Sequence, residues 1–259
     1  MQTQAMNLPA THPNFDFVLR LADGSLVLSQ RLSEWCGHGP VLEADIAFTN
    51  IALDLLGQAR LLYAHAGGLE GAGRDEDAFA YWRNDHEFRN PTLVEVPNGD
   101  FGQSVLRAWF YALYQREIWR ALVGSNDAAL AAIAGKSARE TAYHCSHLAG
   151  WVIRLGDGTE ESHHRMQAAL DYLWPYTREL LAEDAVDTAA RASGLAPGLS
   201  ALAEGWTRES GEVLASATLT PPATSKFLST GRQGRHSEHL GYLLAEMQSL
   251  ARAHPGARW

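Results

Sequence analysis

Helical periodicity dominates this chain, and its longest periodic stretch runs from Pro40 to Gly67. Apolar residues occur on nearly every side of this predicted helix, a pattern typical of a buried helix. Pro40 suits a first turn, and Gly67-Gly68 provides a stop. A narrow polar stripe interrupts the apolar surface: Glu43, Asn50, Asp54 and Gln58. Because unpaired polar groups are costly inside a protein, this stripe must face a metal, a substrate or polar groups of another helix.

The other periodic segments predict further helices, most of them separated by short glycine-rich breaks. The expected ranges are about 23–36, a short helix within 75–88, then 101–123, 127–155, 160–184, 185–217 with a break at 194–198, and 236–254. Residues 89–100 form one extended connection, and Asp100 is the expected N-cap of the helix that follows. Alternating patterns typical of strands are almost absent.

This layout predicts an all-α fold, namely a four-helix bundle with a long crossover and additional peripheral helices. We expect a flexible N-terminal lead-in over residues 1–19 and a single domain over 20–259. The core bundle should occupy about 23–156, and the peripheral helices about 160–253.

The 127–155 helix carries a second polar line, formed by Lys136, Glu140 and His144. Two polar helices in a bundle suggest a carboxylate-bridged di-iron site, which uses a Glu from each of two helices and a Glu-x-x-His pair from each of two others. On the polar helices this spacing fails, because Glu140 is followed three residues later by Tyr143. Two matching strings, EESH and ESHH within 160–164, are interpreted as an exposed helix start.

We therefore interpret the polar residues as groups that pair with one another across the core, in the outline of a degenerate di-iron site. Its predicted members are Glu34, Glu43, Asn50, Asp54, Lys136, Glu140 and His144. Lys136 would neutralise Glu43, Asp54 or Glu140. No catalytic, cofactor-binding or metal-ligating residue is expected in this chain.

Composition narrows the functional classes. The formal net charge of −9 argues against nucleic-acid binding and against an anionic membrane surface. Two cysteines outside any CxxC pattern fit a reducing compartment. No basic apolar signal region and no run of about 20 apolar residues is present. These features predict a cytoplasmic protein.

Residues 218–235 lack periodicity and are expected to form an exposed loop. Its cations are Lys226, Arg232 and Arg235. An ordinary solvated loop is the favoured interpretation, and contact with an acidic partner or a CoA phosphate is the alternative. The GRQGRHS segment lacks the GxxxxGK[ST] spacing of a phosphate-binding loop.

Several long blocks carry a specific resemblance. The blocks LSEWCGHGPVLEADIAFTNIALDLLGQAR, NPTLVEVPNGDF, ARETAYH and GRHSEHLGYLLAEMQSL, with the final PGARW, resemble the family of C-type subunits of bacterial phenylacetyl-CoA epoxidases. The resemblance extends from about residue 20 to Trp259 and is weaker over roughly 185–230.

The resemblance implies a ferritin-like helical fold and a place in a multicomponent oxygenase of aerobic phenylacetate breakdown. In such complexes, a related A-type subunit holds the di-iron centre and binds phenylacetyl-CoA. A separate reductase supplies electrons from NADPH, and oxygen is inserted into the aromatic ring as an epoxide. The C-type subunit pairs with this catalytic subunit as its structural partner and lacks a working metal site.

The sequence thus favours a non-catalytic, structural subunit that binds the catalytic di-iron subunit and other components of the complex, and that could form a homodimer when isolated. One alternative is a self-sufficient di-iron oxidase with a non-standard ligand set: Glu34, Glu43, Asp54, Glu140 and His144. A third hypothesis, iron storage, is disfavoured by the missing Glu-x-x-His pairs.

Overall fold

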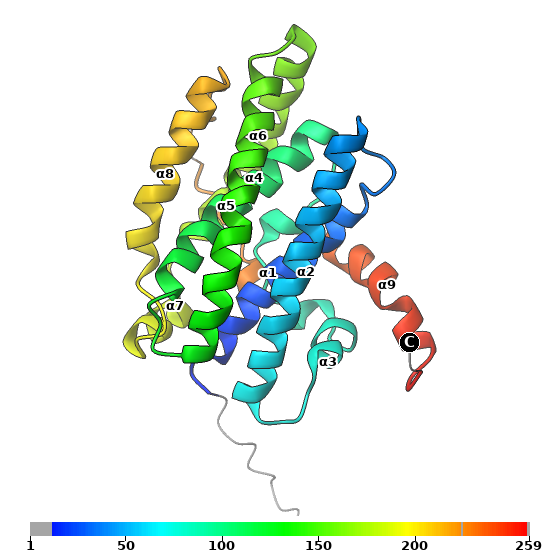
Figure 1. Cartoon of the computed structure of the whole chain (residues 1–259), viewed down its shortest axis with the longest axis vertical. Coiled ribbons are helices and arrows are strands. Elements are labelled where there is room, and N and C mark those ends of the chain that lie inside the picture. Colours follow the sequence, from blue (N-terminus) through cyan, green and yellow to red (C-terminus); the bar gives the residue numbers. More distant parts are fainter. Residues whose placement is uncertain (1–11, 224, 258–259) are drawn as a thin grey trace, which may run out of the picture.

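Four long helices form the centre of the fold. The computed structural model describes residues 12–223 and 225–257. The four helices are α1 (Phe15–Ser33), α2 (Leu42–Glu70), α4 (Phe101–Leu122) and α5 (Ala128–Gly156). Helix α1 packs along α2, α4 packs along α5, and α2 lies beside α5, which closes the bundle (Figure 1). This arrangement is consistent with the ferritin-like bundle that the resemblance implied.

The remaining helices surround this bundle. They are α3 (Glu76–Tyr81), α6 (Glu160–Leu181), α7 (Ala185–Ala192), α8 (Leu199–Ser216) and α9 (Glu238–Ala253), with 3-10 turns η1 (Asp85–Glu87), η2 (Thr92–Val94) and η3 (Gly231–Gln233). Helices α6 and α8 pack on α4 and α5, whereas α9 contacts α3 and extends away from the bundle (Figure 1). Within 12–223 and 225–257, none of the helices is both long and apolar enough to cross a bilayer.

The predicted start of the first helix was wrong. It begins at Phe15 rather than near Asp23, so residues 15–19 of the expected lead-in are helical and buried apart from Asp16. The error arose because Asp23 and Gly24 resemble a helix start. Asp23 is instead a fully buried mid-helix carboxylate. Residues 1–11 of the lead-in lie outside the described residues, and the domain limits remain a prediction.

The end of α2 also differs from expectation. The helix continues through Gly67 and ends at Glu70. Its C-cap is Gly71, whose φ of +70° is the left-handed conformation that glycine adopts at helix ends. Gly67 has another role, because a Cβ at this position would lie 2.4 Å from the carbonyl oxygen of Arg74. It therefore permits close approach of the chain that returns toward α3.

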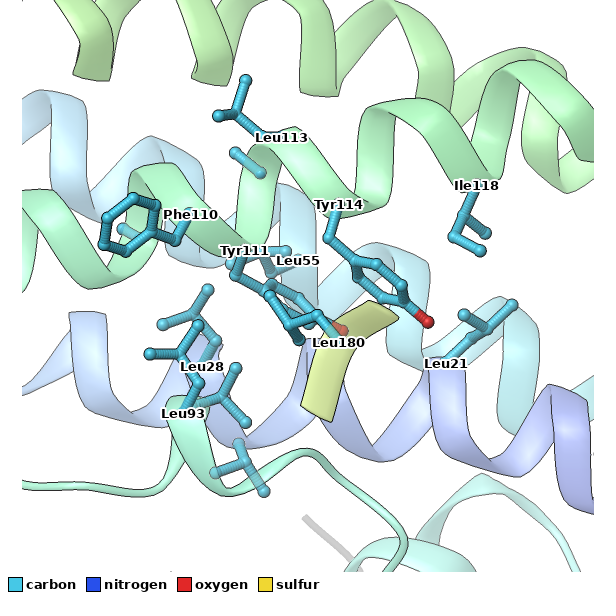
Figure 2. Packing of buried hydrophobic residues seen from close by; sticks show 14 of the residues in the cluster. Leu21, Leu28, Leu55, Leu93, Phe110, Tyr111, Leu113, Tyr114, Ile118 and Leu180 are labelled. Carbon is cyan, nitrogen blue, oxygen red and sulfur yellow. The ribbon is translucent and has the colours of Figure 1, made fainter. Parts of the chain in front are cut away.

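The caps of the two later bundle helices confirm their predicted starts. The Asp100 carboxylate accepts a hydrogen bond from the Gln103 amide, and the Asp127 carboxylate accepts from Ala129 and Leu130. Between the bundle helices the core is apolar and aromatic. Figure 2 shows Tyr111 and Tyr114 of α4 among leucines of α1, α2 and α6.

Three buried carboxylates attach the long connections to the bundle. Asp23 accepts hydrogen bonds from the Arg83 guanidinium, from the Tyr63 hydroxyl at 2.6 Å and from the Arg89 amide at 2.7 Å. Asp23, which is 0% exposed, therefore fixes the first part of the crossover between α2 and α4 on α1, and the Arg31 guanidinium of α1 bonds to the Glu95 carbonyl in its later part.

Glu95 and Glu179 act in the same way on the C-terminal segment. The Glu95 carboxylate accepts hydrogen bonds from the Asn90 side chain at 2.8 Å and from the Ser237 amide at 2.6 Å. It also lies 2.7 Å from Nδ1 of His236. Glu179 accepts from the Thr92 and Arg232 amides and from the Ser229 hydroxyl, at 2.9, 2.7 and 2.7 Å. Both acids therefore connect segments that are far apart in the sequence.

Removal of the Arg83 side chain should destabilise the fold strongly. Arg83→Ala leaves the Asp23 carboxylate buried without its ion-pair partner. Such a loss typically lowers the free energy of unfolding by about 3–5 kcal/mol. The matched control is Arg60→Ala, because Arg60 is 65% exposed in its ion pair with Glu76 and such pairs contribute about 0–1 kcal/mol. Urea unfolding of both variants measures the difference, and equal losses would contradict this role of Asp23.

Candidate functional site

A continuous chain of hydrogen bonds joins all four bundle helices through the buried centre of the bundle. The Gln115 side-chain amide on α4 donates to the Ser25 hydroxyl on α1 at 3.0 Å and to the Gln58 carbonyl on α2 at 3.2 Å. Gln58 in turn donates to Glu140 on α5 at 3.1 Å. The other Glu140 oxygen lies 2.9 Å from the Lys136 ammonium.

This polar chain, defined as Ser25, Gln115, Gln58, Glu140 and Lys136, runs from the dry core to solvent. Ser25 and Gln58 are 0% exposed, and the Lys136 side chain is 51% exposed. The groups at the buried end are therefore neutral, and the groups at the solvent-exposed end are charged. This is expected because an unpaired buried charge is far more costly than a hydrogen-bonded amide. The ammonium group lies over Gly57 of α2.

A second polar pair lies nearby between the same two helices. Nε2 of His144 on α5 is 3.0 Å from the Asp54 carboxylate on α2. The His144 side chain is 1% exposed, whereas Asp54 is 39% exposed. Burial lowers the pKa of His144 below its usual value, and the carboxylates of Asp54 and Glu140 oppose this effect only in part. The neutral imidazole is therefore favoured in the folded protein.

The structure brings together four of the predicted polar residues: Asp54, Lys136, Glu140 and His144. Of the three acids considered as partners of Lys136, the ammonium pairs with Glu140. These contacts support the interpretation that the stripes pair with each other. The polar stripe on α2 reaches the inside only at its C-terminal end, through Gln58.

Three predicted members lie elsewhere. Glu34 bonds to Arg31 and to Asn98, at 2.8 Å each. Glu43 and Asn50 are exposed and make no side-chain hydrogen bond within the described part of the chain. The geometric reason is that residues four apart differ by about 40° around a helix. The stripe therefore winds from Gln58 inside, through half-exposed Asp54, to Asn50 outside.

Two members of the polar chain, Ser25 and Gln115, were missed. Gln115 is an isolated amide in the strongly apolar sequence RAWFYALYQREIW. Such an amide, once buried, requires partners, and this was the available signal. Ser25 gave none, since a serine within a helix usually faces solvent or its own backbone.

The prediction of an exposed cationic loop was wrong for Arg232, which is buried. Arg232 is 5% exposed, and its guanidinium bonds to both oxygens of Asp187, at 2.7 and 2.8 Å, and to backbone carbonyls of α6 and the segment after it. Residues 225–235 are thus partly buried rather than a free loop, because Arg232 fixes this segment to the protein. Lys226 and Arg235 are exposed, and their role in binding a partner or a CoA phosphate stays a prediction.

The donor set does not fit a di-iron centre. Within residues 12–223 and 225–257, no three His, Cys, Asp or Glu side chains are grouped to hold a metal. At the bundle centre, a serine and two glutamines occupy positions facing one another, and a lysine ammonium neutralises the single glutamate. The non-standard set of five ligands is not assembled either, because Glu34 and Glu43 lie apart from Asp54, Glu140 and His144.

Two comparisons with known proteins give a consistent result. The family described as "Phenylacetic acid catabolic protein" matches residues 1–259. A protein from Escherichia coli (strain K12), named as the C subunit of 1,2-phenylacetyl-CoA epoxidase, is 44% identical over 243 residues. The match covers 94% of this chain and 98% of that protein.

Replacement of Gln115 tests the polar chain. Gln115→Leu leaves the buried Ser25 hydroxyl and the Gln58 carbonyl without their donor, which should reduce the free energy of unfolding by about 1–3 kcal/mol. Gln167→Leu is the control, because that amide forms its hydrogen bonds at the surface. Denaturant titration should show a clear loss for the first variant only, and a neutral Gln115→Leu would contradict a required hydrogen bond.

His144 should contribute to the pH dependence of stability. Its lowered pKa means that the unfolded chain binds more protons than the folded chain once the pH falls below the usual histidine value of 6.5. The contribution of His144 to stability is therefore complete above about pH 6.5 and is lost toward lower pH.

This dependence is measured as the free energy of unfolding of wild type and His144→Gln between about pH 5 and 8. The variant should lose less stability on acidification than wild type. His86→Gln, at a histidine that is 70% exposed, should follow the wild-type curve. A His144→Gln curve parallel to wild type would show that His144 does not contribute.

Proposed function

The chain belongs to the phenylacetic acid catabolic protein family, and we propose that it is a structural, non-catalytic subunit of a multicomponent phenylacetyl-CoA epoxidase. In this role it binds and supports the catalytic di-iron subunit. The complex epoxidises the aromatic ring of phenylacetyl-CoA during aerobic phenylacetate breakdown.

The polar chain across the bundle centre is the observation that carries the structural role. Di-iron bundles need several anionic or imidazole ligands that converge on one point. Here the facing side chains hydrogen-bond to one another, and Lys136 provides the positive charge beside Glu140. A cation at this point would have to displace the ammonium and would meet two amides and a hydroxyl.

The proposed role of this chain also determines where we expect the iron, the source of electrons and the cellular compartment. Iron resides in the catalytic subunit, and electrons come from NADPH through a separate reductase. The substrate is a CoA thioester, and both cysteines of this chain are free thiols. Both features support a cytoplasmic location.

Co-purification from the native cell tests the proposed function. The affinity-tagged chain should bring down a di-iron subunit in stoichiometric amount, identified by mass spectrometry. The same cells with an unrelated tagged protein provide the control. If no oxygenase component co-purifies under conditions of phenylacetate growth, the proposal is wrong.

Reconstitution distinguishes the structural role from a catalytic one. The purified chain with the reductase, NADPH and phenylacetyl-CoA should form no epoxide, and activity should appear when the di-iron subunit is added. Iron analysis of the isolated chain should give a substoichiometric content. Turnover without the di-iron subunit, or stoichiometric iron with an oxo-bridge absorption band, would favour the self-sufficient oxidase.

A further inference from the structure

The outer side of α2 carries an unusual set of exposed apolar side chains. Leu42 is 72% exposed, Ile46 50%, Leu53 60% and Leu61 41%. With about 100° of rotation per residue, these four positions fall within an arc of about 100° on the helix, which they share with Asn50 and with Arg60, whose guanidinium is paired with Glu76. On the neighbouring α5, Tyr143 is 52% exposed. We call the surface defined by these five residues the α2/α5 face.

Single exposed apolar residues are ordinary, but a contiguous apolar surface indicates a binding site. Helix α2 packs against α1, α5 and α3, and Figure 1 shows it on the outside of the bundle. Its α2/α5 face is therefore left uncovered within the described residues.

The two helices are long enough to present an interface of ordinary size. Helices α2 and α5 have 29 residues each, so each is about 43 Å long. A strip about 20 Å wide along their full length has an area of about 860 Å², which is an upper limit for the face. One partner typically buries about 800 Å² in a stable complex.

Helical glycines on these two helices allow close approach of a partner, as do Gly211 of α8 and Gly241 of α9, which also meet open space. A Cβ at Gly135 or Gly150 would meet open space, and one at Gly57 would meet only the Lys136 ammonium at 3.9 Å. Each such glycine costs about 1 kcal/mol relative to alanine in a helix. Open space shows that no contact within this chain requires them, whereas close approach of a partner backbone would.

The charged residues on and beside the face indicate what kind of partner can bind there. Lys136 and Asp54 are partly exposed but already paired with Glu140 and His144, so a partner can cover them without leaving a lone charge. Arg139 is exposed and has no ion pair among the described residues, which calls for a carboxylate on the partner. The net charge of −9 opposes a second copy of this chain.

We propose that the α2/α5 face is the docking surface for the catalytic subunit, which covers it with a helical surface of apolar and small residues and a carboxylate opposite Arg139. The inference rests on the proposed function and names the surface that performs it. Docking would also remove solvent from the exposed ends of the polar chain and of the Asp54–His144 pair.

The test uses one substitution on the face and a matched substitution elsewhere. Leu53→Glu places a charge at the centre of the face. Leu250→Glu makes the same change on α9, where the leucine is 55% exposed and also helical. Circular dichroism and thermal unfolding of both variants verify that the fold is retained. Isothermal titration with the purified catalytic subunit then gives Kd.

Leu53→Glu should raise Kd at least about tenfold, as expected for a residue at the centre of an interface, and Leu250→Glu should change it less than about twofold. Wild-type affinity for Leu53→Glu, or equal loss in both variants, overturns the assignment of this face while the complex itself stands. No binding by the wild-type chain refutes the proposed function as well. If Leu53→Glu only converts a wild-type homodimer to a monomer, the occupant is a second copy and the proposal is wrong.

Discussion

The cost of burying polar groups without partners shapes the centre of this fold. There the chain places a hydroxyl and two amides, which hydrogen-bond to one another without carrying net charge, although the side-chain oxygen of Gln115 has no partner among the described residues. Charge appears only where the polar chain reaches solvent, at Glu140 and Lys136. The same rule explains the buried acids outside the centre, because Asp23 and Glu179 each receive several hydrogen bonds from distant segments. The long connections thus adopt one conformation because a buried carboxylate would otherwise lack donors.

The same constraint distinguishes this bundle centre from a metal centre. A metal centre requires convergent ligands whose charge is balanced by the ion, so its residues depend on the ion for satisfaction. In this chain Gln58 and Glu140 depend on Gln115 and Lys136 instead, all from the same polypeptide. The hydrogen bonds of the polar chain therefore form within this chain alone. What the protein offers another molecule lies on its surface, and this is consistent with a subunit whose contribution is to bind and support a catalytic partner.

The sequence predicted the features that depend on local spacing. The helix starts at Asp100 and Asp127 were confirmed, since a capping aspartate acts on amides two or three residues away. Features that depend on distant partners were missed or wrong: Asp23 looked like a helix start, and Arg232 looked like a loop cation until Asp187 was seen beside it. The α2 stripe was predicted in part, because a repeat of four residues drifts around the helix and only its last member, Gln58, faces the centre.

The all-round apolar character of α2 is explained once both of its sides are considered. A helix that is apolar on nearly every side is expected to be buried on every side, yet α1 and α5 cover only the inner side, and Leu42 and Leu53 remain more than half exposed. The inner residues follow the rule within the single chain. The outer residues follow the same rule only if another chain completes the burial. With the docking proposed above, α2 carries in one helix the packing pattern of both the core of the chain and its interface.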